Sequence, residues 1–228
     1  MASTYTAYNA FEYAKQFIGN MDLERLAPGL LNDVSKMFWG YAPWRWTLGL
    51  MPQITLVSDT QDYAVTLPDD FLYLYDILQL DGKTTRHLKP TAIFPQTGVL
   101  RAGQAGSAAI MSINGTDTLR IDPTPGTIPS TAPSQKLISI YKKTAPEVTK
   151  TTMYTAGFLE IPDDFYWVYR EGVIWKAMTW AQDPRAGDVK VQGGQVAFSG
   201  QRAAFEAALL TCAQQEKLYE IDQQEAAR

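Results

Sequence analysis

The chain has 228 residues, of which 46% are hydrophobic and 19% are charged, a balance typical of a folded globular protein. The formal net charge is −4 and the 20 Lys and Arg residues are scattered, which argues against general affinity for nucleic acid, because that affinity needs clustered cations. The lone Cys212 excludes an intrachain disulfide and a cysteine-based metal cluster. Neither a signal peptide nor a stretch long enough to cross a membrane is recognisable, so we expect a protein made in the cytoplasm with no membrane partner.

Two helices are predicted near the start of the chain. Between residues 5 and 18 the apolar side chains recur at helical spacing, and Gly19 is suited to end that helix. A second helix is predicted from about Pro28 to residue 41. The aromatic segment Pro43-Trp44-Arg45-Trp46 follows. We interpret this segment as a hydrophobic plug where a helix meets a sheet. The alternative is a binding plate in which Arg45 and the Trp rings make cation–π contacts.

The middle of the chain, from about residue 48 to 145, has short β-type runs separated by turn-forming residues. The runs Ile54–Val57 and Tyr63–Leu67 are predicted to form a hairpin. The pairs Asp81-Gly82 and Asn114-Gly115 predict tight primed turns between strands, because these residue types accept positive φ angles.

One short motif occurs twice, in residues 62–75 and 157–169. Each copy has a strand-like apolar run, then Pro-Asp-Asp-Phe, then an aromatic residue four positions after the Phe. Proline cannot donate a hydrogen bond within a sheet, and the Asp pair suits a turn or the first turn of a helix. We therefore predict two structural corners, with each Phe buried in a core. The corner residues are Pro68, Asp69 and Phe71 in the first copy and Pro162, Asp163 and Phe165 in the second.

The helical period returns after the second motif and continues to Asp183-Pro184, with Gly172 placed to allow close contact between helices. Residues 187–194 are interpreted as a connector. A last helix is predicted from about Ser199, a suitable N-cap, to near residue 222. Its apolar stripe is lost after Tyr219.

These elements predict an α+β fold. Four helices, from the N- and C-terminal parts of the chain, form a helical bundle, and an antiparallel β-rich domain is inserted between the second and the third. The predicted division assigns residues 1–47 and 160–228 to the bundle and residues 48–159 to the inserted domain.

No catalytic, cofactor-binding or metal-binding residue is predicted. His87 is the lone histidine, which excludes paired-imidazole chemistry and histidine-rich metal sites. Gly103 and Gly106 lack the Lys and the strand-to-helix context of a phosphate-binding loop. The pairs Asp69-Asp70 and Asp163-Asp164 each follow a Pro at an element boundary. A turn or a helix start therefore explains them better than carboxylate catalysis or calcium binding.

In its order of elements the chain resembles the bacteriophage head-to-tail adaptors, the neck or connector proteins that include podophage tail tubular protein A. The resemblance rests on the second helix leading into Pro43-Trp44-Arg45-Trp46, the run from Tyr63 to Phe71, the segment Leu78-Gln-Leu-Asp-Gly82, and the second Ile-Pro-Asp-Asp-Phe near residue 161. It implies a structural virion protein and not an enzyme. It also implies a helical bundle with an inserted β-domain, assembled as a ring of twelve copies.

The resemblance implies partners and a location as well. The ring would dock below the portal, meet the tail or nozzle protein on its other side, and let DNA pass through its channel without sequence-specific binding. Its place would be the neck of the virion, after synthesis in the host cytoplasm. A mildly acidic, unclustered charge pattern agrees with a channel in which DNA slides.

The C-terminal tail is predicted to be a portal-contact arm. It has lost its apolar stripe, and it offers acidic and amide side chains that a basic or amide-rich groove could bind. The predicted arm residues are Glu216, Tyr219, Glu220, Ile221, Asp222, Gln223, Gln224, Glu225 and Arg228.

Two other classes of function are compatible with the sequence. The aromatic-rich β-domain could bind carbohydrate or recognise a host, with Trp and Tyr rings as stacking plates. The third class is an enzyme whose site carries no local sequence signature.

Overall fold

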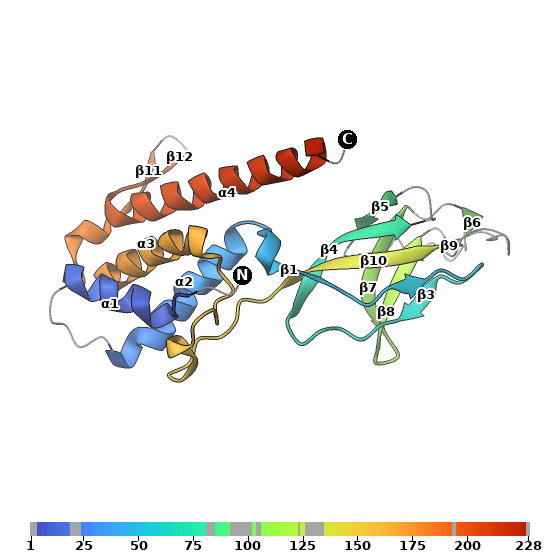
Figure 1. Cartoon of the computed structure of the whole chain (residues 1–228), viewed down its shortest axis with the longest axis horizontal. Coiled ribbons are helices and arrows are strands. Elements are labelled where there is room, and N and C mark those ends of the chain that lie inside the picture. The colour runs from blue at the N-terminus through green and yellow to red at the C-terminus, as the bar shows by residue number, and fades with distance from the viewer. Residues whose placement is uncertain are drawn as a thin grey trace. The chain divides into compact units, whose positions relative to one another are not determined.

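The computed structural model describes residues 4–18, 24–80, 85–91, 102–103, 106–122, 124–125, 135–192 and 195–226. The chain divides into two compact units: a helical unit, Met1–Thr47 with Ala145–Arg228, and a β unit, Leu48–Thr144. Figure 1 shows the chain leaving the helical unit after α2, passing through the strands, and returning to form α3 and α4. The predicted α+β fold, with a β-rich insert in a helical bundle, is confirmed.

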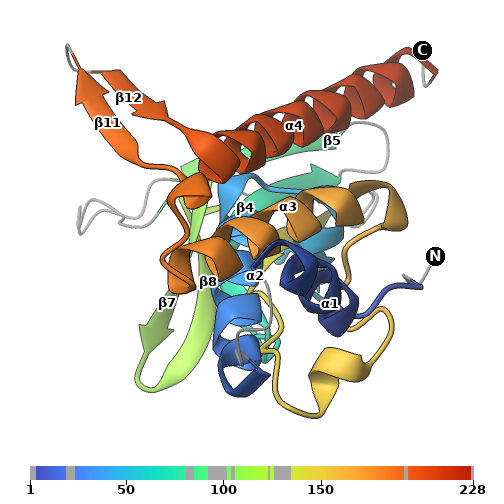
Figure 2. The same cartoon turned by 90° about the vertical axis from the view of Figure 1, so that its left-hand side faces the viewer.

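Four helices build the helical unit: α1 (Ala7–Ile18), α2 (Ala27–Tyr41), α3 (Asp163–Trp180) and α4 (Gly200–Ala226). The central helix is α3, which contacts the other three (Figure 2). Its buried residues lie on all sides, as is typical of a helix enclosed by others. The short 3-10 helices are η1 (Glu24–Leu26), η2 (Arg45–Thr47), η3 (Thr152–Tyr154) and η4 (Pro184–Ala186). No helix among the described residues has the length and hydropathy needed to cross a membrane.

Gly172 lies where α3 meets both α2 and α4. A Cβ atom at this position would lie 2.6 Å from Val34 Cγ1 of α2 and 2.7 Å from Phe205 Cε2 of α4. Both distances are shorter than the 3.0 Å below which real Cβ contacts essentially do not occur. The predicted close helix contact at Gly172 is confirmed.

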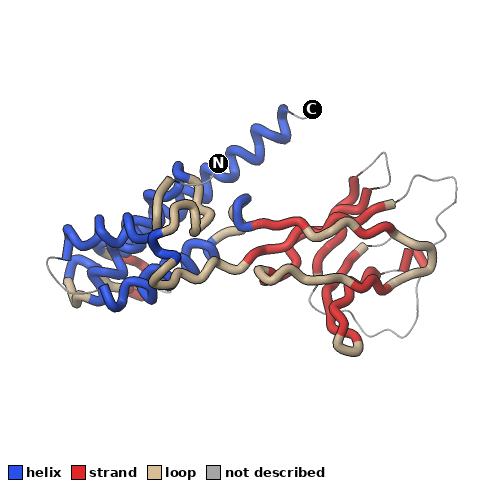
Figure 3. Tube along the Cα trace, turned by 60° about the horizontal axis from the view of Figure 1, so that its bottom comes forward, coloured by secondary structure: helices blue, strands red, loops and turns tan. Residues whose placement is uncertain are grey.

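The β unit is an eight-stranded sheet in the order β1-β10-β4-β5-β7-β8-β3, with β2 also paired to β10. Its strands are coloured red in Figure 3. The strands are β1 (Leu48–Leu50), β2 (Ile54–Thr55), β3 (Asp62–Ala64), β4 (Phe71–Leu80), β5 (Thr85–Pro90), β7 (Ser107–Ile113), β8 (Thr116–Asp122) and β10 (Lys136–Lys143). A separate pair joins β6 (Ala102–Gly103) to β9 (Thr124–Pro125). Of these pairs, β5–β7 and β6–β9 are parallel. The core of the unit consists of Leu56, Tyr63, Ile77, Leu88, Ala108, Leu119, Ile121 and Leu137.

The predicted hairpin between Ile54–Val57 and Tyr63–Leu67 is wrong. Strand β2 pairs with β10 and strand β3 pairs with β8, so these neighbouring runs have distant partners. The segment between them folds around the Tyr63 hydroxyl. This hydroxyl accepts a hydrogen bond from Val57 N at 3.1 Å and donates to Thr60 O at 3.1 Å.

The predicted primed turn at Asn114-Gly115 is confirmed. Ile113 pairs with Thr116 across the turn, and Asn114 and Gly115 have φ angles of 50° and 79°. The other predicted turn, Asp81-Gly82, lies outside the described residues. Its flanking strands are antiparallel, with Leu80 opposite Thr85.

Residues 187–194, interpreted as a connector, contain part of a hairpin instead. The strands β11 (Val189–Gln192) and β12 (Gln195–Phe198) pair antiparallel just before α4. Figure 2 shows this hairpin projecting from the helices. The sequence carries the signal for it, because apolar and polar residues alternate on both sides of Gly193-Gly194, a residue pair typical of hairpin turns.

The boundaries of the β unit fall at Thr47–Leu48 and at Thr144–Ala145, whereas the sequence-based division put the second one at 159–160. The residues between these positions include Val148 and Leu159, which are buried in the helical core. The two strands next to the boundaries, β1 and β10, pair with each other, with Leu48 opposite Lys142.

Candidate functional site

The two Pro-Asp-Asp-Phe corners begin with the same turn. Phe71 N donates to Pro68 O at 3.0 Å, and Phe165 N donates to Pro162 O at 2.9 Å. After this turn the backbones diverge, because strand β4 begins at Phe71 whereas helix α3 begins at Asp163.

The second corner fixes the start of α3. The Asp163 carboxylate accepts hydrogen bonds from Thr4 N and Thr4 Oγ1, each at 3.1 Å. Phe165 is buried and stacks on Trp46 with ring centroids 5.2 Å apart. Tyr169, one helical turn later, is fully buried and donates to Leu31 O at 3.2 Å. These contacts hold the N-terminal segment and α2 against α3.

In the first corner the described residues hydrogen-bond to Asp70 and not to Asp69. Tyr141 Oη donates to Asp70 Oδ1 at 2.8 Å, and Thr144 N donates to Asp70 O at 2.7 Å. Asp69 is exposed and makes no hydrogen bond or ion pair with a described residue. Phe71 is half-buried, not buried as predicted, and its ring stacks on Tyr141 at 5.6 Å. It is less enclosed than Phe165 because it packs on one face of the sheet edge and not among helices.

The aromatic segment after α2 is packed as a plug. Trp44 is buried, and its ring is nearly parallel to that of Trp46 at a centroid distance of 5.4 Å. Trp44 Nε1 donates to Phe38 O at 2.6 Å. Arg45 forms a paired contact with Glu216 of α4, with Nε to Oε2 at 2.9 Å and Nη2 to Oε1 at 3.2 Å. The geometry favours the plug over the binding plate.

This ion pair changes the start of the predicted portal-contact arm. The buried stripe of α4 runs through Phe205, Leu209 and Cys212 to Glu216, which is 7% exposed. Glu216 is therefore part of the helical unit, held by Arg45. Beyond it the backbone remains helical to Ala226, four residues further than predicted, and Arg228 lies outside the described residues. Figures 1 and 3 show the last turns of α4 extending past the neighbouring helices.

The buried stripe of α4 makes Cys212 chemically inert. Its burial, with a smaller contribution from the charge of Glu216, raises the pKa of the thiol to about 12. At pH 8 we expect a thiol-specific reagent to modify the folded protein on the order of a hundredfold more slowly than the urea-unfolded chain, because the thiolate is the reactive form. The rate in the folded state should rise with pH over the whole range in which the protein stays folded, because the thiol remains largely protonated there. Equal rates before and after unfolding would show that the thiol is accessible.

The two chain segments at the base of the β11–β12 hairpin are closely packed. Gly187 has a φ angle of 85°, and a Cβ atom there would clash with Ser199 O. Asp188 N donates to Ser199 Oγ at 2.9 Å, and Ser199 N donates to Asp188 O at 3.1 Å. The Ser199 side chain thus bonds to Asp188 and closes the hairpin, whereas the sequence predicted it as the N-cap of α4.

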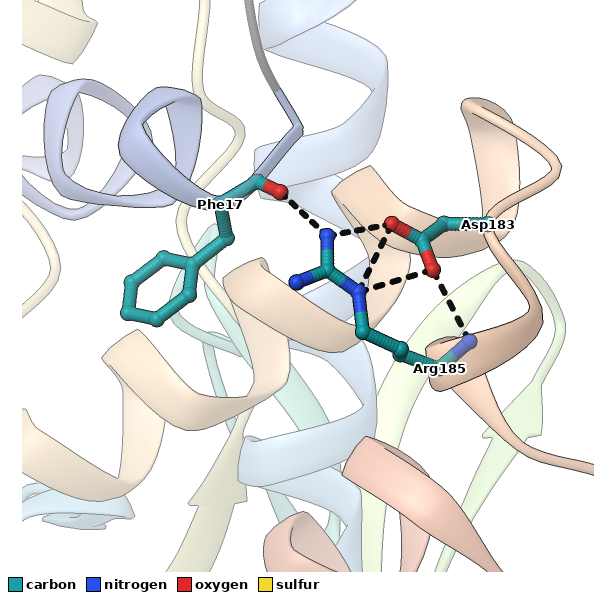
Figure 4. A network of polar contacts seen from close by, with 3 residues as sticks. All are labelled: Phe17, Asp183 and Arg185. Atoms are coloured by element: carbon teal, nitrogen blue, oxygen red, sulfur yellow. Dashed lines mark hydrogen bonds and ion pairs between the residues drawn. The ribbon is translucent and has the colours of Figure 1, made fainter.

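The root of this hairpin is also tied to α1 (Figure 4). Arg185 of η4 donates from Nη2 to Phe17 O at 2.6 Å, and so satisfies one of the last carbonyls of α1. The Asp183 carboxylate accepts from Arg185 N at 2.9 Å and from Arg185 Nε at 3.0 Å. These bonds to Arg185 hold the pKa of Asp183 below its usual range.

Among the described residues, no group of three or more His, Cys, Asp or Glu side chains could hold a metal ion. His87 Nδ1 lies 2.8 Å from Asp76 Oδ2, in an exposed position on the sheet. The contacts described above are structural: they form the two corners, the aromatic plug, the base of the β11–β12 hairpin and the end of α1.

The sequence matches the model of a known protein family. The family model for the SU10 adaptor protein matches residues 6–225, a span that includes all of the β unit and nearly all of the helical unit. No match to a curated protein was found. The chain therefore belongs to the SU10 adaptor protein family and is a structural head-to-tail adaptor of a bacteriophage.

Proposed function

We propose that this adaptor works as a ring of twelve copies in the neck of the virion, beneath the portal, where it connects the capsid to the tail or nozzle protein and continues the DNA channel. The observation that carries the proposal is the family match over residues 6–225, which spans both units without a break. The even distribution of charge supports it, because a channel that lets DNA slide should not bind phosphates strongly.

The last turns of α4 are the proposed portal contact. The arm now begins at Lys217, because Glu216 is held by Arg45. From Leu218 to Glu225 the sequence carries three acidic residues and no cation. A basic or amide-rich groove on the portal is the partner that fits this chemistry.

Removal of residues 217–228 is the direct test. The truncated chain keeps all the side chains of α4 that the structure describes as buried, so its free energy of unfolding should stay within about 1 kcal/mol of that of the full chain. It should nevertheless fail to join portal-containing heads in a co-sedimentation assay.

A matched control is Thr211→Lys, an exposed change on the same helix that leaves the arm intact and should leave attachment unchanged. Normal attachment of the truncated chain would remove the arm from the proposal and direct the search to the helical bundle. Cryo-electron microscopy of the particle tests the ring itself, and a single copy or a place on the outer capsid would overturn it.

A further inference from the structure

The register of the β11–β12 hairpin gives it an apolar side. Val189 is opposite Phe198 and Val191 is opposite Val196, whereas Lys190 is opposite Ala197 and Gln192 is opposite Gln195. Directly opposed residues of an antiparallel pair occupy the same face of the sheet. Val189 and Phe198 therefore share one face of the hairpin, and Ala197 lies on the other.

The described part of the apolar face is open and lies next to a cation. Val189 is 44% exposed. The Arg202 guanidinium lies between two rings, 4.6 Å from the centroid of Phe198 and 5.0 Å from that of Trp175. Arg202 has no ion pair or hydrogen bond with a described residue, and its Nε is buried without a partner. A hairpin of two strands is marginally stable in water, so a partner on this face would stabilise it.

A complementary surface lies at the other end of the helical unit, around the first turn of α3. Trp167 and Tyr5 are 36% and 46% exposed. Asp164 is exposed and has no ion-pair partner among the described residues. The hairpin follows the last turn of α3, and the 18 residues of this helix separate the two surfaces by ~27 Å. Figure 2 shows the hairpin and α1 on opposite sides of the helical unit.

We propose that the apolar face of the hairpin in one copy docks on the Tyr5–Asp164–Trp167 surface of a second copy. The charges are complementary, because each surface carries an ion that pairs with no opposite charge among the described residues, Arg202 on one and Asp164 on the other, beside exposed apolar side chains. The two surfaces are different and lie near opposite ends of α3. Such a contact is head-to-tail, and its repetition leads to a closed ring or a filament. The inference rests on the proposed ring and names the contact that builds it.

Cross-linking of the full chain tests the contact. Cys212 is buried, so cysteines added by Val189→Cys and Trp167→Cys would be the accessible thiols. A short bifunctional maleimide should then give a ladder of oligomers that grows with protein concentration. The matched control pairs Trp167→Cys with Ala197→Cys on the opposite face of the hairpin, and its yield should be at least about fivefold lower. Equal yields, or no ladder at millimolar concentration, would overturn the proposal.

Charge reversal gives an independent readout. Asp164→Arg and Arg202→Glu should each weaken self-association in sedimentation velocity by about tenfold, because like charges then face each other. The double variant restores one opposite pair at every contact and should recover association; failure to recover it would count against the pairing. Circular dichroism verifies that each variant is folded. If particles contain a ring and these variants still assemble normally, the proposed ring is supported and this contact between copies is contradicted.

Discussion

Replacing Phe165 with Ala is expected to lower the free energy of unfolding by about 3–5 kcal/mol. The Phe165 ring is 4% exposed and stacks on Trp46, which stacks in turn on the buried Trp44. These large rings are held by several neighbours, so they cannot collapse into the space that the substitution opens. Urea unfolding followed by tryptophan fluorescence measures the loss, since both Trp residues report on the helical unit.

The same motif supplies the matched control. Phe71→Ala should cost about 1–2 kcal/mol, because the ring is half-buried and stacks on Tyr141 in the β unit. Asp163→Asn and Asp69→Asn should each cost no more than about 1 kcal/mol. A loss for Phe71→Ala as large as that for Phe165→Ala would contradict the difference in burial. Asp variants that fold normally but no longer attach to heads would show that a corner is a binding site.

Gly172→Ala is expected to destabilise the protein by about 1–3 kcal/mol. Alanine is the better helix former, and this alone would stabilise α3 by about 0.5–1 kcal/mol. The added Cβ, however, would lie 2.6 Å from Val34 and 2.7 Å from Phe205, and both side chains are fully buried. Helices α2 and α4 would have to move away from α3, which loosens the contacts of the central helix. Thermal unfolding by circular dichroism measures the effect.

Gly40 of α2 is the control for this substitution. A Cβ atom at Gly40 would have no heavy atom within 4 Å, so Gly40→Ala should gain helix propensity without a clash. We expect it to raise stability by a few tenths to 1 kcal/mol. The two Gly→Ala changes therefore have opposite signs. A stabilising Gly172→Ala would mean that the helices at this crossing adjust more easily than a close-packed core allows.

The helices could be predicted because their signals are local. The apolar spacing of residues 5–18, Pro28 in the first turn of α2, and the period after Pro162 each lie within one element, and the structure has helices at all three places. The pairing of strands could not be read in the same way. Strand β2 finds its partner about eighty residues later in β10, and no local pattern specifies a partner at that distance.

At the candidate site, too, local features could be predicted and long-range contacts could not. The loss of apolar residues near the end of α4 was visible in the sequence, and it indicated an arm. The ion pair between Glu216 and Arg45 was not visible in the sequence, because the two residues lie 171 positions apart. The aromatic segment around Arg45 predicted a hydrophobic plug, and the Trp rings do pack as one, but the pairing of Arg45 with a distant carboxylate had no local signal. The hairpin before α4, in contrast, had a local signal in its alternating residues around Gly193-Gly194.

The pairing of β1 with β10 has a consequence for how such adaptors can change. The first and last strands of the β unit lie side by side, with Leu48 opposite Lys142, and the Cα atoms of such partners are about 4.5–5.5 Å apart. A turn of a few residues would close the same gap. Genetic exchange could therefore replace the whole β unit with another module whose ends are adjacent, while the four helices keep their order and their core.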